Sequence, residues 1–291
     1  MDHVAVLVLD TPIPGVTEHF GDFGDNAVDL LNSLSLPLKT YQIAYSVCDD
    51  RDDSEYKKVA QAVLDDVASM IVSGTVKGVV LTGSRSDSFA TNVGWIDALD
   101  HFIKNTLFNS PRLPMVGFCF GHQILAKNMD CKVDRNVPEH GWETGLTTIE
   151  LNKSILDIEK SPFRDVLTTD EGEFMKQINL IESHGDVVYH LPVTESSAHA
   201  LLSETKFQCI GSTAKCSVQG LVTEEGPIKV LTFQGHPEFT SDLLLKLLQT
   251  NLEKGTLDHA SFQKLVYNTQ TLVNQGSVMA KAIIQFIETY I

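Results

Sequence analysis

Cysteine is scarce in this chain and is not arranged in pairs. The 291 residues contain five cysteines, and no two of them have the C-x-x-C spacing of a zinc site or a redox motif. An odd number without paired spacing also disfavours a disulfide framework, so a reducing, cytoplasmic location is expected. The five are Cys48, Cys119, Cys131, Cys209 and Cys216.

Long apolar runs and an excess of basic residues are also missing. The first apolar run, Val4 to Leu9, is too short to span a bilayer and follows no basic residue, which argues against a signal peptide and a membrane span. Lysine and arginine number 22 against 38 acidic residues, so the formal charge is −16. A chain with this charge and no basic patch repels polyanions, so neither nucleic acid nor a membrane surface is an expected partner.

The order of apolar runs predicts an α/β fold. Short strand-like runs at Val4 to Leu9, Gly78 to Leu81 and Met115 to Phe118 alternate with stretches of helical periodicity at Asn26 to Leu34 and Tyr56 to Ile71. This alternation is typical of a flavodoxin-like, doubly wound and mostly parallel sheet flanked by helices. Active-site loops are then expected at the carboxyl ends of the strands.

The second half of the chain predicts short strands and then helices. Residues 1–240 are expected to form one domain with a small antiparallel extension, and residues 241–291 to form C-terminal helices packed on the same domain. The expected strands are Thr147 to Leu151, Ile178 to Ile181, Ala198 to Leu202, Val218 to Thr223 and Ile228 to Phe233, and the expected helices are Leu243 to Leu252 and Phe262 to Tyr290.

A cysteine between a strand and a helix is the strongest chemical signal. Gly117-Phe118-Cys119-Phe120-Gly121 follows an apolar strand and leads into the helical stretch Ile124 to Met129. The pattern predicts a sharp turn that exposes a nucleophile, with glycines where side chains would collide with neighbouring backbone. A helix N-terminus and a nearby imidazolium both favour the thiolate of Cys119. The alternative, a free cysteine of the core, does not explain the flanking glycines.

A histidine and a glutamate follow the last predicted strand of the sheet. In Gln234-Gly235-His236-Pro237-Glu238, His236 can serve as base and acid for a thiol, and Glu238, two residues later, can hold its ring in the correct tautomer. The alternative is a lone surface histidine. The strand-like run ending at Leu81 is followed by Gly83 and Ser84, and a backbone N–H there could form an oxyanion hole with that of Phe120. Alone, this loop is also compatible with an ordinary strand-to-helix turn.

Together these residues resemble the class I, or triad-type, glutamine amidotransferases. The family elbow G-x-C-x-G-H-Q is matched by Gly117 to Gln123, and its H-x-E pair by His236 and Glu238. A substrate loop S-H-G-D, as in the amidotransferase domain of GMP synthase, stands here as Ser183, His184, Gly185 and Asp186. The resemblance implies that Gln123 and this loop hold the α-amino and α-carboxylate groups of a glutamyl substrate. His122 is interpreted as packing under the elbow.

One loop departs from the family pattern. The usual oxyanion loop contains Gly-Gly or Gly-Pro-Gly, whereas this chain has Gly83 followed by Ser84, Arg85, Ser86 and Asp87. That form looks like the stand-alone members of fungi and plants, including γ-glutamyl peptidases. Its polar side chains could select a substrate larger than glutamine.

The resemblance implies a cysteine hydrolase acting on a small γ-glutamyl substrate through a glutamyl thioester. No metal or organic cofactor is expected. The chain has no G-x-x-x-x-G-K-[ST] loop and too few residues after Phe239 for a synthetase site, which excludes a complete GMP synthase. A glutaminase subunit that supplies ammonia to a separate synthetase, a catalytically silent interaction module, and an unrelated α/β-hydrolase with a cysteine nucleophile are the alternatives. The α/β-hydrolase is disfavoured because that fold places its acid before its histidine.

Overall fold

A seven-stranded sheet forms the centre of the part of the chain that the structure describes. The computed structural model describes residues 1–44, 53–194 and 197–291. The strand order is β2-β1-β3-β4-β12-β11-β9. The strands from β2 to β12 in this order run parallel, β11 pairs antiparallel with β12, and β9 pairs antiparallel with β11. The predicted, mostly parallel sheet is thus confirmed. The strands are β1 (His3–Val8), β2 (Leu38–Gln42), β3 (Val76–Leu81), β4 (Pro114–Phe118), β9 (Lys206–Cys209), β11 (Leu221–Glu225) and β12 (Lys229–Phe233).

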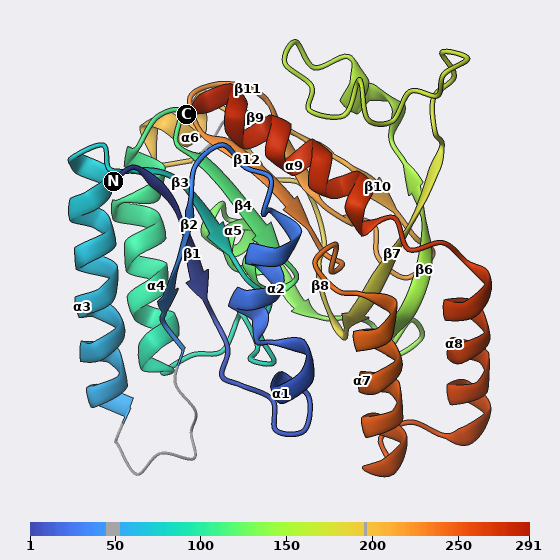
Figure 1. Ribbon diagram of the computed structural model, residues 1–291. Coiled ribbons are helices and arrows are strands. Elements are labelled where there is room, and N and C mark those ends of the chain that lie inside the picture. Colours follow the sequence, from blue (N-terminus) through green and yellow to red (C-terminus); the bar gives the residue numbers. More distant parts are fainter. Residues whose placement is uncertain (45–52, 195–196) are drawn as a thin grey trace.

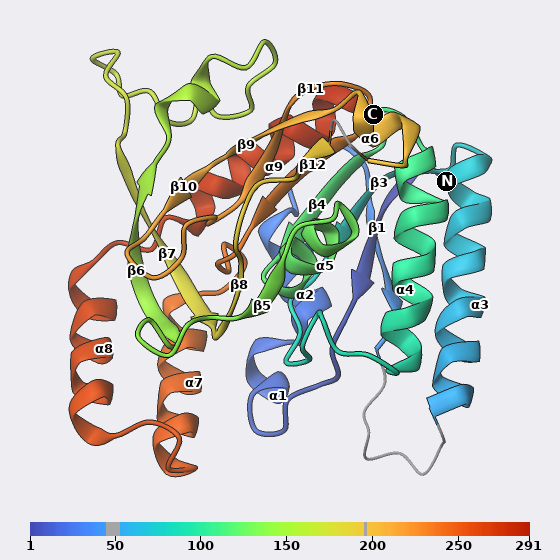
Figure 2. The ribbon, with the colours of Figure 1, turned by 180° about the vertical axis from the view of Figure 1, so that it is seen from behind.

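Helices cover both faces of this sheet. Helices α3 (Asp53–Val72), α4 (Gly94–Asn105) and α5 (Phe120–Asn128) lie on one face, whereas α2 (Phe23–Leu30) and α9 (Gly276–Tyr290) lie on the other (Figures 1 and 2). The side chains of β1 alternate accordingly, since Leu7 joins the core under α3 to α5 and Val6 joins the core under α2 and α9. Both cores are largely apolar at the sheet, as is typical of a doubly wound fold.

Two small antiparallel sheets lie outside the main sheet. The first contains β6 (Glu143–Leu151), β7 (Gln177–His184) and β10 (Gly211–Ser212), and the second pairs β5 (Val133–Arg135) with β8 (Asp186–Val188). The β6–β7 hairpin stands out from the main sheet (Figure 1). At its base, a β-bridge between Ile181 and His236 joins this extension to the loop after β12.

The last part of the chain is helical, as predicted. Helices α7 (Ser241–Glu253) and α8 (His259–Thr271) lie side by side, and α8 also contacts β6 (Figure 1). The expected helical stretch from Phe262 to Tyr290 is divided into α8 and α9. Between the two helices, Gln275 N–H donates to Asn179 O at 2.9 Å and not to a carbonyl of α8. No helix in the described ranges is long and apolar enough to cross a bilayer.

Other predicted bounds are wrong. Ala198 to Leu202 was expected as a strand, but the short helix α6 (Ala200–Ser203) begins there, and the strand β9 follows it. The run is too short for helical and strand periodicity to be told apart. The strand expected at Val218 begins at Leu221, after Gly220. Helix α2 starts earlier than predicted because Asp22 and Asp25 form a capping box at its N-terminus. Short turns of helix also occur at α1 (Thr17–Phe20), η1 (Leu107–Asn109) and η2 (Lys153–Leu156).

Candidate active site

Cys119 occupies a strained turn between β4 and α5. Its backbone has φ 47° and ψ −101°, a region that residues other than glycine rarely adopt, and its N–H donates to Phe233 O at 2.8 Å. A Cβ on Gly117 would lie 2.6 Å from the carbonyl carbon of Gly121, and one on Gly121 would lie 2.3 Å from Leu81 O. Both glycines are therefore required sterically, as the elbow motif predicts.

His236 lies between Cys119 and Glu238. Its Nδ1–H donates to Glu238 Oε1 at 2.8 Å, and Cys119 is near enough to act on the charge of the same ring. The position of the loop is fixed by His236 N–H, which donates to Ile181 O at 2.8 Å. Burial opposes the charged ring, but Glu238 and Cys119 outweigh it and hold the pKa of His236 well above its ordinary value. The arrangement favours an imidazolium next to the thiol.

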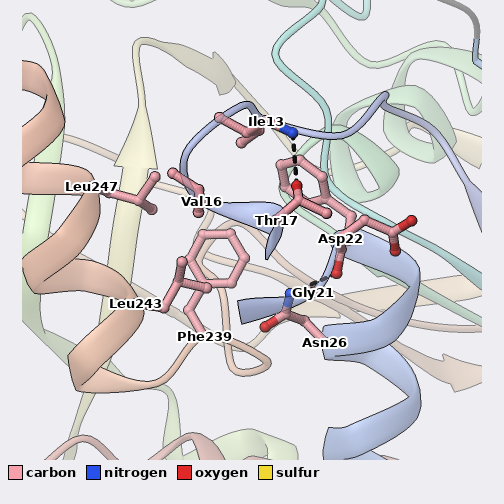
Figure 3. A pocket seen from close by; sticks show the side chains of 10 residues that line it. Ile13, Val16, Thr17, Gly21, Asp22, Asn26, Phe239, Leu243 and Leu247 are labelled. Atoms are coloured by element: carbon pink, nitrogen blue, oxygen red, sulfur yellow. Dashed lines mark hydrogen bonds between the residues drawn. The ribbon is translucent and has the colours of Figure 1, made fainter. Parts of the chain in front are cut away.

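An apolar wall shields His236 on one side. The ring of Phe239 stacks on that of His236 at a centroid distance of 4.1 Å, and Phe23 lies 6.4 Å from it. Behind Phe239 is a small apolar pocket between α1, the start of α2 and α7, into which Leu243 and Leu247 point (Figure 3). Since the triad side chains are at most 5% exposed, the hydrogen bonds of His236 form in a largely dry environment.

The predicted oxyanion loop lies against the triad. A Cβ on Gly83 would be 2.8 Å from His236 Cε1, and Gly121 N–H donates to Thr82 O at 3.1 Å. The N–H of Phe120 is the first of α5 and has no acceptor within the helix. Ser84 Oγ accepts a hydrogen bond from Ser86 N–H within the same loop. Gly83 thus lies against His236 and Phe120 begins α5 directly after Cys119, while the oxyanion role of Gly83, Ser84 and Phe120 stays a prediction.

The charged side chains of this loop are engaged within the chain. Arg85 donates to both carboxylate oxygens of Asp10, with Nε at 2.9 Å and Nη2 at 2.7 Å. Asp87 accepts from Arg135 Nη2 at 2.9 Å, and Arg135 Nη1 donates to Asp186 at 2.6 Å. Arg85 and Asp87 therefore tie the loop to its neighbours rather than projecting free toward a substrate.

The predicted substrate residues converge on Gln123. Its Nε2 donates to Asp186 O at 3.1 Å and to Gln234 Oε1 at 3.2 Å. His184 Nδ1 lies 2.9 Å from the same carbonyl of Asp186. Gly185 O accepts from Asn136 N–H at 2.8 Å, and Ser183, half-buried on β7, pairs in register with Thr144. Ser183 to Asp186 therefore form a rigid turn beside the elbow helix.

Sequence reasoning missed several residues of the site. Gln234 Nε2 lies 3.8 Å from Cys119 Sγ, and its position directly before Gly235-His236 could have indicated it. Arg135, Glu143 and Glu182 reach the site only through long-range strand pairing, so no local pattern pointed to them.

The other described cysteines differ from Cys119 in their surroundings. Burial raises the pKa of Cys131 to about 12, with Asp130 adding to the effect, and burial also raises the pKa values of Cys209 and Cys216. These thiols are held in the unreactive form at neutral pH. Cys48 lies outside the described residues.

Comparisons with known proteins agree with this geometry. The family model of the class-I glutamine amidotransferases matches residues 65–253. A glutamine amidotransferase-like protein of Schizosaccharomyces pombe is 28% identical over 253 residues, 83% of this chain and 81% of that protein. Gamma-glutamyl peptidase 2 of Arabidopsis thaliana is 29% identical over 175 residues, which cover 59% of this chain and 57% of the length of the peptidase. A glutamine amidotransferase structure from Thermotoga maritima superposes with a TM-score of 0.61 over 99% of this chain and 100% of its own, at 17% identity, which confirms the flavodoxin-like fold.

Proposed function

This chain belongs to the class-I glutamine amidotransferase family, and from that premise we propose that it is a cysteine hydrolase that cleaves the γ-glutamyl amide bond of glutamine or of a γ-glutamyl peptide. The observation that carries the proposal is the arrangement of Cys119, His236 and Glu238, in which His236 donates to the carboxylate of Glu238 and the charge of Cys119 acts on the same imidazole. The similarity to a γ-glutamyl peptidase supports the same substrate class.

The proposed reaction is acyl transfer in two steps. The thiolate of Cys119 attacks the γ-carbonyl carbon, and the oxyanion that forms accepts hydrogen bonds from Phe120 N–H and from an N–H near Gly83 or Ser84. His236 then gives its proton to the departing nitrogen, which breaks the C–N bond and leaves a glutamyl thioester. Water that loses a proton to His236 attacks the thioester, and glutamate leaves as the thiol is restored.

The proposed binding mode places the amino-acid end of the substrate against Gln123 and the Ser183 to Asp186 turn. The hydrogen bonds of Gln123 and His184 to Asp186 O hold this turn before substrate arrives. Preorganisation of this kind keeps the scissile carbonyl within reach of the thiolate.

A substrate screen tests the proposal. The purified chain is incubated with glutamine and with glutathione-type γ-glutamyl peptides, and released glutamate is quantified by mass spectrometry, with Cys119→Ala as control. Hydrolysis by the wild type alone supports the proposal, and equal rates for both proteins refute it. Turnover of glutamine without peptides would instead favour a subunit that supplies ammonia to a synthetase.

A further inference from the structure

Three buried ionisable side chains form a cluster behind the substrate turn. His184 Nε2 lies 3.2 Å from Glu143 Oε2 and 3.3 Å from Glu182 Oε2. The exposed fractions are 3% for His184, 5% for Glu143 and 0% for Glu182. Charges this deeply buried are stable only when they are paired.

The hydrogen-bond partners of His184 determine its charge. Nδ1 lies 2.9 Å from Asp186 O, and because a carbonyl oxygen can only accept, Nδ1 must carry a proton. Nε2 faces two carboxylates, and an imidazole nitrogen is a stronger base than either of them, so it also carries a proton. Although burial opposes the charge, Glu143 and Glu182 raise the pKa of His184 to about 10. Both nitrogens donate, so the ring is an imidazolium.

The two carboxylates are not equivalent. Glu143 Oε2 accepts from Gln219 Nε2 at 2.7 Å as well as from His184, and although burial opposes ionisation, these hydrogen bonds lower the pKa of Glu143. Neither carboxylate oxygen of Glu182 has a hydrogen-bond partner among the described residues, although Oε2 lies 3.3 Å from His184 Nε2. Burial raises the pKa of Glu182. Glu143 is therefore the principal anion that balances His184.

The cluster adjoins the reacting groups. Glu182 packs under Gly235, where a Cβ would lie 2.3 Å from Glu182 Oε1. Polar contacts also lead from His184 to Asp186 O, from there through Gln123 to Gln234, and from Gln234 Nε2 to Cys119 Sγ at 3.8 Å. On α5, His122 stays neutral, since burial and the charge of His184 lower its pKa to about 3.

Two further charges belong to the surroundings of His184. The charge of His184 also acts on Asp186, whose carboxylate is paired with Arg135 at 2.6 Å, and the charge of His236 acts on Glu182. Asp186 is thus balanced by Arg135 and His184 by Glu143, while the charge of His184 also acts on Cys119.

We propose that His184 is a permanent imidazolium, clamped by Glu143 and Glu182, which fixes the substrate turn through Asp186 O and stabilises the thiolate of Cys119. His184 is a positioning residue, because it exchanges no proton during turnover. The inference rests on the proposed function only in treating Cys119 as the reactive thiol.

Nitrogen-15 NMR of the histidine side chains tests the charge state without any substrate. The His184 signals are assigned by their loss in His184→Asn, and both ring nitrogens should remain protonated between about pH 6 and 8. Glu143→Gln should bring the titration of His184 into this range, whereas Glu150→Gln, an exposed position on the same strand, should not. A ring with one unprotonated nitrogen in the wild type, including one that coordinates a cation held by the three side chains, would overturn the proposal.

Alkylation of Cys119 tests the effect on the thiolate. Iodoacetamide labelling, followed by peptide mapping, should be roughly tenfold slower at Cys119 in His184→Asn near neutral pH, because the thiolate loses a neighbouring positive charge. If loss of the His184 imidazolium alone unfolds the protein, the double variant E143Q/H184N serves instead, because it removes both members of the ion pair. This variant should keep the fold while still slowing alkylation. A wild-type alkylation rate in a folded variant would refute the electrostatic role. Neither readout depends on hydrolysis, so a failed substrate screen would leave both results interpretable.

Discussion

Gly83→Ala probes whether the loop after β3 and the triad act as one unit. The new Cβ would lie 2.8 Å from His236 Cε1, about 0.6 Å closer than an ordinary van der Waals contact of 3.4 Å. It would also lie 3.1 Å from Phe23 Cε1. His236 cannot move away freely, because Phe239 stacks on it and Glu238 holds Nδ1. A misplacement of about 1 Å can cost roughly 100-fold in rate, so a shift of this size should lower kcat by about 10- to 100-fold. Overpacking should also cost about 1–3 kcal/mol of stability.

The assay compares Gly83→Ala with Gly78→Ala, which lies on β3 itself. A Cβ at Gly78 would approach Pro114 Cγ to 3.2 Å, a mild contact remote from the triad, so this control should lose some stability but keep its kcat. Steady-state kinetics on the substrate found in the screen and thermal melts separate the two effects. Unchanged kcat in a folded Gly83→Ala variant would show that the loop does not contact the working conformation of His236.

Other variants test the remaining assignments. Cys119→Ala should abolish hydrolysis with little change in melting temperature; turnover above a mock purification would contradict the triad. His236→Ala should lose more activity than Glu238→Gln, measured as kcat, because losing a base costs more than losing its orienting partner; a kinetically silent Glu238→Gln would identify it as a bystander. His122 should lower the free energy of unfolding by up to roughly 5 kcal/mol as the pH drops from about 6.5 toward 3. The reason is that its pKa is about 3 in the folded protein, whereas in the unfolded chain the ring accepts a proton near pH 6.5. Denaturant titrations at both ends of this range should show a flatter dependence for His122→Gln, and an identical slope would refute the assignment.

The elbow was predictable because its constraints are local. A side chain on Gly117 would collide with the backbone of Gly121 within the same turn, although one on Gly121 would collide with Leu81 on the neighbouring strand β3. The pair His236 and Glu238 was predictable for the same reason, since alternate residues of an extended segment lie on one side. The parallel sheet followed from the alternation of apolar runs with helical periodicity.

The charged surroundings of the site were not predictable from local patterns. Arg135 and Asp186 are 51 positions apart, and Glu143 and His184 are 41 apart, so both pairs depend on strand register that no local period encodes. Arg85 and Asp87 illustrate the same limit, because their positions suggested substrate contacts whereas Asp10 and Arg135 hold them. In the Ala198 to Leu202 run, neighbouring apolar residues fitted a strand or a helical turn equally well.

Labelling with a glutamine-like electrophile tests the central claim most directly. A diazo-ketone analogue of glutamine should form one adduct on Cys119, because the Gln123 pocket delivers the reagent and the imidazolium of His236 maintains the thiolate. Peptide mapping should show no adduct on the other four cysteines. Excess glutamine or a γ-glutamyl peptide should protect Cys119 from labelling. Protection by the peptide alone would favour a peptidase. Labelling spread over several cysteines, or an unlabelled Cys119 in folded protein, would contradict the glutamyl-specific active site.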